Sequence, residues 1–584
     1  MTRRTGAYLP AGQAGVVPYP ADQLVANTGV NTHFEIDGAY PTDGPSPYRD
    51  CAGGQTAVIA LIQQIGFRWV RNGAPGAQIG TGPNTSQAVS PSVGFANWVA
   101  LLNQLAAAGI QELCLFDSPE QGSSIASFLT LLANYVASNP LPKLKGFEGI
   151  NEPNSAQNGP IWPGNTPANG RTAWSSGSDY NAGDQVTYGG GNYICRQASR
   201  SGSNAPTTNN WGTNTWWYSP LASDSVRIAT TLRTILTAAG QPSTPIGTWT
   251  PYSPANADQF QALPSGVFDF ITGHQYTNGD QSAGFEDPGL GFANGWVSQN
   301  SSPGFAVAKF SGQMWITETG WVSGPAGASV MPDGYKSVAA IDETSAATYL
   351  TRAVLSAYFG NTPLAIYELL DEGQPRMVYL SGGVSQEGQW GVARYDLTLK
   401  NAGTAIQNLF ALYNDPAGRP SLTPYPIAWS GLPSPRCWGL SQRSDGSYLV
   451  AVWNQAYTTD LGGQSAANWS SATNYTTGTY VRVAGTGTYD TGFTYVYKAV
   501  ASSGPGNGGA VTPGTNSAVW AASWTAGTPN PPAATTATLT LARNATSVTA
   551  YRPVQGTAGT VLTGTGGVYS VPVYADPTIL HIVP

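Results

Sequence analysis

Between residues 29 and 415 the chain alternates short apolar runs with longer segments in which apolar residues recur every three to four positions. In the segment 222–239, for example, Val226, Ala229, Leu232 and Leu236 fall on one face of a helix. The pattern predicts strands at 29–34, 68–72, 112–117, 146–150, 245–250, 268–276, 314–317 and 364–369. It predicts helices at 55–65, 96–108, 123–138, 222–239 and 344–359.

Eight strands that alternate with helices indicate a (β/α)8 (TIM) barrel, which belongs to the α/β class. In this fold the functional side chains gather where the strands end. The predicted strand ends supply Asn72, Asp117, His274, Tyr276 and Glu368. A doubly wound sheet is the structural alternative, but residues 29–38 lack the G-x-G-x-x-G loop that would follow its first strand.

The pattern changes after residue 420, where short strands are separated by turn residues. Apolar or alternating runs at 448–454, 537–541, 547–551, 567–574 and 578–583 are typical of an antiparallel β-sandwich.

Two segments resemble each other and interrupt these regions. Residues 174–186 and 469–481 share the pattern W-S-S-x-x-x-Y-x-x-G-x-x-V. Each continues to an aromatic strand, at 192–195 or 494–497, and the second has an extra loop at 484–492. With so few aliphatic residues, each is predicted to be a small β module built around aromatic rings. We expect Trp174 and Trp469 in the module cores, and at least one exposed ring at Trp216 or Trp217.

These observations divide the chain into five parts. We expect an N-terminal segment at 1–28 packing on the sandwich, and a barrel at 29–170 and 221–415. The first inserted module occupies 171–220. The sandwich occupies 416–465 and 528–584, and the second module occupies 466–527.

Composition excludes several classes of function. A net charge of -7 gives no reason to expect nucleic acid, whose phosphates require clustered Lys and Arg. No apolar run approaches the roughly 18 residues that span a bilayer. Four scattered cysteines show no metal-ligand spacing. Only 10% of residues are charged, while Gly, Pro and aromatics are abundant. We therefore expect a secreted, extracellular or periplasmic protein, although no signal peptide is readable after Met1.

Two short stretches carry the candidate chemistry. They read INEPN at 150–154 and WITETGW at 315–321, and each places a glutamate just after a predicted strand. Two carboxylates delivered in this way, Glu152 and Glu318, suffice to cleave a glycosidic bond without a cofactor or metal. In a barrel both would lie at the same face, on strands four and seven.

The two stretches together resemble those of the clan A glycoside hydrolases, which are (β/α)8 enzymes that retain anomeric configuration. Family 39 and its relatives look most similar, on the opening run at 29–34 and the trailing sandwich. The resemblance implies that Glu152 is the general acid/base and Glu318 the nucleophile. It implies that Asn151 contacts the substrate 2-hydroxyl, that Arg71 lies beside the nucleophile, and that Tyr276 donates to it.

The chain differs from the clan A pattern at strand eight, where Tyr367 or Glu368 stands in place of the tryptophan that the clan commonly has. Other candidates are open between two interpretations. His33 and His274 either bind substrate or are core histidines. Trp249 and Trp321 either stack on sugar rings or pack in the core.

The inserted segments are similar to carbohydrate-binding modules of families 5 and 12, through the pattern W…Y-x-x-G-x-x-V…Y…P…W. The first is the cleaner match. Candidate glycan-binding residues in the modules are Trp216, Trp217, Trp520 and Trp524.

The sequence therefore predicts a retaining glycoside hydrolase that acts on a polysaccharide or oligosaccharide. A transglycosylase of the same mechanism and a non-catalytic glycan-binding protein are the alternatives. We expect a carbohydrate polymer as partner, no nucleic acid or membrane, and a monomer.

Overall fold

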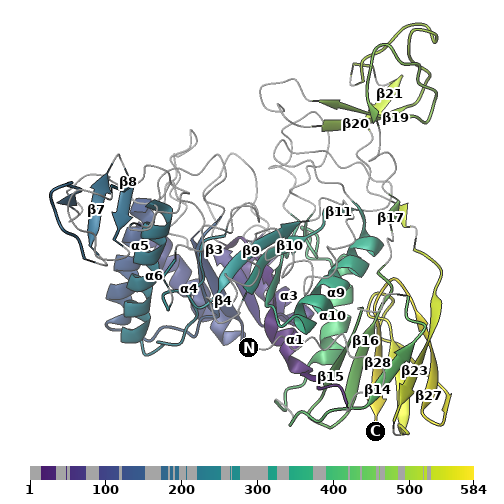
Figure 1. Ribbon diagram of the computed structural model, residues 1–584, viewed down its shortest axis with the longest axis horizontal. Coiled ribbons are helices and arrows are strands. Elements are labelled where there is room, and N and C mark those ends of the chain that lie inside the picture. Colours follow the sequence, from purple (N-terminus) through teal and green to yellow (C-terminus); the bar gives the residue numbers. More distant parts are fainter. Residues whose placement is uncertain are drawn as a thin grey trace.

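The computed structural model (Figure 1) describes most of the chain in segments. These are residues 15–34, 48, 53–73, 91–116, 122–151, 172–181, 184–188, 191–195, 205–206, 217, 220–250, 263–264, 266–276, 314–324, 341–371, 390–418, 421–433, 437–455, 459–460, 467–484, 494–513, 515–516, 518–522, 528–529, 531–542 and 544–584.

Seven parallel strands form the central sheet, in the order β5-β4-β3-β2-β13-β10-β9. They are β2 (Thr28–Asn31), β3 (Trp69–Gly73), β4 (Gln111–Phe116), β5 (Gly146–Ile150), β9 (Ile271–Tyr276), β10 (Met314–Gly320) and β13 (Leu364–Ile366). Parallel bridges Phe147–Ile246, Asn151–Thr250 and Gly247–Phe270 place residues 246–250 between the two edges. This eighth extended segment closes the barrel.

Gly149 permits that closure. A Cβ at this position would lie 2.6 Å from the backbone nitrogen of Trp249, so no side chain fits between β5 and the closing segment. The glycine thus lets residue 148, one position earlier, project inward from a tightly paired strand.

Helices cover the outside of the barrel. They are α1 (Asp22–Asn27), α3 (Gly54–Ile65), α4 (Pro91–Ala107), α5 (Gly122–Val136), α6 (Pro220–Ala238), α9 (Glu343–Phe359) and α10 (Asn401–Tyr413). Figure 1 shows α5 and α6 on one side and α9 and α10 on the other. The predicted helical face of α6 is buried, including Ala229, Leu232 and Leu236. Asp342 caps α9, where its carboxylate accepts from the backbone N–H of Ser345 at 2.8 Å. The predicted barrel is confirmed.

Apolar side chains fill the barrel interior near the strand starts. Trp69, Leu113, Phe270, Trp315 and Ala365 form one buried cluster, in which the rings of Phe270 and Trp315 stack with centroids 4.1 Å apart. The interior is therefore a packed core at this end, and the polar groups lie at the other.

Lys145 covers this cluster. Its Nζ lies 5.1 Å from the ring centroid of Trp69 and 5.4 Å from that of Trp315, and donates to the carbonyl of Ala26 at 3.0 Å. Burial lowers the pKa of Lys145 from 10.5 to about 8. The unfolded chain therefore binds more protons than the folded one between these two values, and this group favours folding increasingly as pH rises through that window.

We expect Lys145→Met to reveal this effect. In folded wild type, Lys145 is charged below pH 8 and neutral above it, so the free-energy cost of burying its charge disappears as pH rises. Methionine carries no charge at any pH. The difference in unfolding free energy should shift by about 2–3 kcal/mol in favour of wild type between pH 7.5 and 10.5. Urea unfolding of both proteins across that range measures it. A difference that stays constant with pH would contradict the lowered pKa.

The β-sandwich packs on the α9–α10 side of the barrel (Figure 1). One sheet has the order β1-β15-β16-β28-β24-β25 and the other β14-β23-β27-β26. The first contains β1 (Tyr19–Pro20), β15 (Trp438–Gln442), β16 (Tyr448–Val452), β24 (Ser547–Tyr551), β25 (Gly559–Val561) and β28 (Thr578–Val583). The second contains β14 (Ile427–Ser430), β23 (Thr535–Leu541), β26 (Gly564–Thr565) and β27 (Val568–Val573).

Buried polar contacts fix the sandwich to the barrel. Arg352 of α9 is fully buried, and donates to the carbonyls of Ala575 at 2.7 Å and Asn454 at 2.8 Å. Tyr19 and Pro20 of the N-terminal strand β1 pair in parallel with β15. The N-terminal strand is therefore part of the sandwich sheet.

The two inserted modules have the same construction. The first contains β6 (Thr172–Ala173), β7 (Gln185–Tyr188) and β8 (Gly191–Ile194). The second contains β18 (Ala467–Asn468), β19 (Tyr480–Ala484), β20 (Thr494–Ala499) and β21 (Trp520–Ala522), beyond a two-stranded stalk of β17 (Thr459–Asp460) and β22 (Thr528–Pro529). Both predicted small β modules, like the sandwich, are present.

One aromatic pair organises each module core. The ring of Tyr180 lies edge-on to Trp217 with centroids 5.2 Å apart, and Tyr475 lies edge-on to Trp520 at 5.4 Å. The tyrosine hydroxyl accepts from a serine backbone N–H in both, Ser175 at 2.7 Å and Ser470 at 2.8 Å.

The hairpin register shows which residues of the two modules correspond. Val186 pairs with Tyr193 in the first module, whereas Val481 pairs with Tyr497 in the second. Tyr193 thus corresponds to Tyr497.

Candidate active site

Polar side chains from several strands meet inside the barrel where those strands end. The group comprises Asn31 of β2, Arg71 of β3, Glu148 of β5, Asn151 just after β5, His274 of β9 and Glu318 of β10. All are buried except Asn151, which is partly exposed. The structure therefore brings together four residues singled out from the sequence, Arg71, Asn151, His274 and Glu318.

Arg71 lies at the centre of this group. Its Nη1 donates to Glu318 Oε1 and to Asn31 Oδ1, both at 2.7 Å. Its Nε donates to Glu148 Oε2 at 2.6 Å, and its Nη2 to Glu148 Oε1 at 3.0 Å and Asn151 Oδ1 at 2.9 Å. One guanidinium thus joins two carboxylates in a fixed fork.

The two carboxylates hold Arg71 in its charged form. Burial alone lowers the pKa of Arg71, but the charges and hydrogen bonds of Glu148 and Glu318 outweigh it and raise that pKa above its ordinary value. A buried, charged network of this kind is characteristic of functional sites.

His274 supplies a second donor to Glu318. Its Nε2 lies 3.4 Å from Arg71 Nη2, which can only donate, so we assign Nε2 as the acceptor and place the proton on Nδ1. Nδ1 lies 3.2 Å from Glu318 Oε2 and donates to it. Both oxygens of Glu318 are therefore hydrogen-bonded by donors. The residue keeps 7% exposure, so it lies at the boundary between core and solvent.

The structure also places a residue that the motifs did not single out. Glu148 is completely buried, and the hydroxyls of Thr250 and Thr317 donate to it at 2.5 and 3.0 Å. A charged residue within the apolar run at 146–150 was the signal available in the sequence.

A second polar group lies at the end of β13. The Nε2 of His33 is 3.2 Å from Glu368 Oε2, and the hydroxyl of Tyr48 is 3.5 Å from the same oxygen. Glu368 is completely buried, whereas His33 remains partly exposed. Tyr367 packs edge-on against Trp390, a ring that the sequence interpretation missed, with centroids 5.9 Å apart.

The two tryptophans left open between sugar stacking and packing are both buried. Trp249 is 1% exposed within the main hydrophobic cluster, and Trp321 is 7% exposed and packs against Tyr349 of α9. Both rings are therefore buried in the structure.

The module tryptophans are corrected in the same way. Trp217 and Trp520 are 0% and 1% exposed, because each forms the core of a fold with few aliphatic side chains. Trp174 and Trp469, expected in the cores, are instead only partly buried. In the first module the ring of Trp174 lies edge-on to Tyr188, which is also partly exposed, with centroids 5.1 Å apart.

Several candidates lie outside the described residues. These are Glu152, Asp117, Trp216 and Trp524, together with the side chain of Tyr276. Asn151 is described, and its backbone N–H donates to the carbonyl of Phe116 at 2.9 Å. Asn151, the residue before Glu152, is thus fixed beside Arg71.

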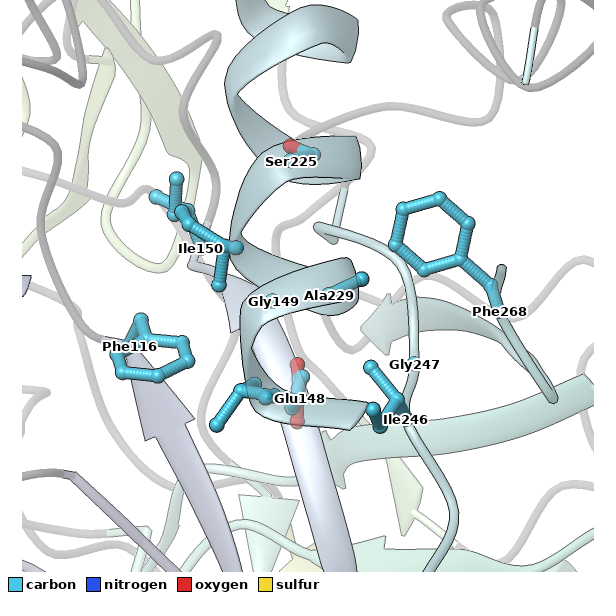
Figure 2. Close-up of a pocket in the computed structure, with 11 residues that line it drawn as sticks. Phe116, Glu148, Gly149, Ile150, Ser225, Ala229, Ile246, Gly247 and Phe268 are labelled. Carbon is cyan, nitrogen blue, oxygen red and sulfur yellow. The ribbon is translucent and has the colours of Figure 1, made fainter. Parts of the chain in front are cut away.

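A small void lies behind the strand that carries Glu148, between the barrel and α6. Figure 2 shows Ser225 and Ala229 of α6 facing Ile150, Phe116 and Phe268 across it. Its volume of about 10 Å³ admits at most a single water molecule. It is a packing defect of the wall rather than a binding site.

Among the described residues, no group of three or more His, Cys, Asp or Glu side chains is arranged to hold a metal ion. Within the same segments no helix has the length and apolar character needed to cross a membrane.

Comparison with known proteins identifies the first inserted module. Residues 173–217 match the sequence model of carbohydrate-binding module family 5/12, as the sequence pattern indicated. No curated protein matches the chain.

Solved structures similar to this chain include glycoside hydrolases of three families. One is a family 39 glycoside hydrolase from the gut symbiont Bacteroides cellulosilyticus WH2, with 12% identity and a TM-score of 0.44 over 97% of this chain and 83% of that one. AbfB, a family 51 alpha-L-arabinofuranosidase from Bifidobacterium longum, has 10% identity and a TM-score of 0.43 over 99% and 98%. GH5_18 from Streptomyces cattleya, in complex with GlcNAc, has 15% identity and a TM-score of 0.36 over 69% and 83%.

Proposed function

We propose that this chain is a retaining glycoside hydrolase that cleaves a polysaccharide by double displacement. Glu318 is the nucleophile and Glu152 the general acid/base. The observation that carries the proposal is the environment of Glu318, whose two oxygens accept from Arg71 and His274 at the ends of the barrel strands. These donors favour the ionised carboxylate that a nucleophile requires.

In the first displacement, an oxygen of Glu318 attacks the anomeric carbon and the glycosidic C–O bond breaks. The electron pair of that bond goes to the leaving oxygen, which takes the proton of Glu152. The product is a glycosyl ester of Glu318. Asn151, held by Arg71 at 2.9 Å, is placed to contact the 2-hydroxyl of the sugar.

In the second displacement, a water molecule attacks the same carbon and gives its proton to the carboxylate of Glu152. The ester bond breaks, and its electron pair returns to Glu318. Two inversions restore the original anomeric configuration, and no cofactor is consumed.

The first module supports a polymeric substrate. A binding module on the same chain raises the effective concentration of a polysaccharide at the cleft, which small substrates do not require. Among the described residues of this module, the partly exposed pair Trp174 and Tyr188 is the best candidate for contact with sugar rings. The second module has Val483 where the first has Tyr188, since Val186 and Val481 occupy equivalent hairpin positions.

The two modules therefore provide a matched comparison. We expect Tyr188→Val, which copies the second module, to weaken binding of the full chain to insoluble polysaccharide roughly 3- to 10-fold. Hydrolysis of a soluble oligosaccharide should stay unchanged. Trp469→Ala in the second module serves as the control and should alter binding less. Equal losses from both variants, measured by sedimentation binding, would place the glycan surface elsewhere.

The activity itself is tested by screening polysaccharides for release of reducing ends. The panel includes chitin, β-glucans and bacterial exopolysaccharides, each incubated with wild type and with Glu318→Gln. The proposal expects at least one polymer to be cut by wild type alone. Binding without cleavage across the panel would instead favour a glycan-binding protein.

A further inference from the structure

Glu148 is a buried carboxylate that the double displacement does not use. It is 0% exposed and accepts from Arg71 Nε at 2.6 Å, Arg71 Nη2 at 3.0 Å, Thr250 Oγ1 at 2.5 Å and Thr317 Oγ1 at 3.0 Å. Both of its oxygens are thus occupied by donors. It does not reach the substrate, so any role in the reaction acts through Arg71.

Arg71 needs a permanent anion because its other partner loses charge during the reaction. Arg71 is 3% exposed, and an unpaired buried cation is costly. When Glu318 forms its ester with the sugar, the carboxylate charge disappears. Glu148 then remains as the anion that neutralises Arg71 until water releases the ester.

Charge counting shows what this does to the transition state. Glu148, Arg71 and Glu318 together carry one negative charge before attack. They carry none in the intermediate. Without the charge of Glu148 the same group would be neutral before attack and positive afterwards. The transition state is oxocarbenium-like, so a more positive surrounding opposes its formation.

We propose that Glu148 is a positioning residue and permanent counter-ion, which fixes the Arg71 fork toward Glu318 and keeps the site from becoming positive during the reaction. This inference rests on the proposed hydrolase activity. It adds a third carboxylate to the pair that performs the chemistry.

The test measures pH profiles of kcat/KM for Glu148→Gln on the polysaccharide that the panel identifies. We expect kcat to fall about 10²- to 10³-fold, which one lost electrostatic contact in a buried site typically produces. Because Arg71 then pairs with Glu318 alone, ionised Glu318 is favoured further and the acid limb of the profile moves to lower pH. A purely structural role would reduce the active fraction without moving that limb.

Two further variants keep the inference testable. Thr250→Val removes a donor to Glu148 but preserves side-chain shape, so the carboxylate that holds Arg71 is fixed less firmly, and kcat should fall about tenfold with KM unchanged. This variant decides the question if Glu148→Gln does not fold. The control is Glu112→Gln. Glu112 is a buried glutamate on β4 that accepts from the indole N–H of Trp98 at 3.0 Å, and its replacement should leave the pH profile unchanged.

The outcomes separate this inference from the proposed function. A folded Glu148→Gln that keeps wild-type kcat, or that loses activity with an unmoved acid limb, would overturn the role of Glu148 alone. Wild-type kcat in a folded Thr250→Val would do the same. Absence of turnover by wild type would count against the hydrolase assignment instead.

Discussion

Replacing Glu318 with glutamine is expected to lower kcat/KM by at least about 10⁴-fold, equivalent to roughly 5.5 kcal/mol of transition-state stabilisation. The amide keeps the shape of the side chain but cannot attack the anomeric carbon. Arg71 Nη1 faces one oxygen of Glu318 and His274 Nδ1 faces the other. The NH2 group of glutamine therefore meets a donor at either position. Release of reducing ends by wild type and variant measures the loss.

The control for this variant is Glu112→Gln, the same substitution at another buried barrel glutamate. It removes one carboxylate without touching the polar group around Arg71, so activity should stay near wild type. Thermal melting of both variants shows whether they fold. Activity of folded Glu318→Gln within tenfold of wild type would refute its role as nucleophile.

Replacing Glu152 with alanine is expected to lower kcat on polysaccharide about 10²- to 10⁴-fold, because the leaving oxygen loses its proton donor. Aryl glycosides with acidic leaving groups need no such proton and should still form the intermediate. Water then reacts slowly, since no base activates it. Added azide needs no base, and should raise turnover of these substrates and yield a glycosyl azide of retained configuration.

The configuration of that azide separates the two carboxylate roles. Retention requires that azide attack an ester on Glu318. An inverted azide would show that Glu152 is the nucleophile and that the assignments are exchanged. Azide should not accelerate wild type, in which Glu152 already activates water.

The periodicity of the sequence was sufficient for the fold. Alternating apolar runs and helical faces place each strand within a few residues, because one face of every helix and both faces of parallel strands must be buried. The segment 245–250 illustrates the limit. It was predicted as a strand and closes the barrel, yet it pairs only through separate bridges at Ile246, Gly247 and Thr250.

Side-chain direction was harder to predict than position. Trp249 lies at a strand end on the functional face, but its ring points into the surrounding core. Trp217 and Trp520, both glycan-binding candidates, are buried in the module cores, while Trp174 packs against the first core and lies partly exposed. Residue type and spacing do not determine which side of a tightly paired strand faces solvent when both sides carry large rings.

Glu148 illustrates what a motif cannot convey. It precedes the conspicuous Asn-Glu-Pro by three residues and reads as part of an apolar run. Only the closed barrel brings it to Arg71, Thr250 and Thr317, from three other parts of the chain. Arg71, by contrast, was anticipated beside Glu318 and donates to it at 2.7 Å.

Proton NMR of the wild-type reaction tests the proposed double displacement most directly, because each displacement inverts the anomeric carbon and two restore it. The substrate is the polymer identified by reducing-end release, followed from the first minutes of cleavage. The account predicts that the new reducing end first appears in the configuration of the cleaved bond, and that the other anomer grows later through mutarotation. First appearance of the opposite anomer would contradict the covalent intermediate on Glu318.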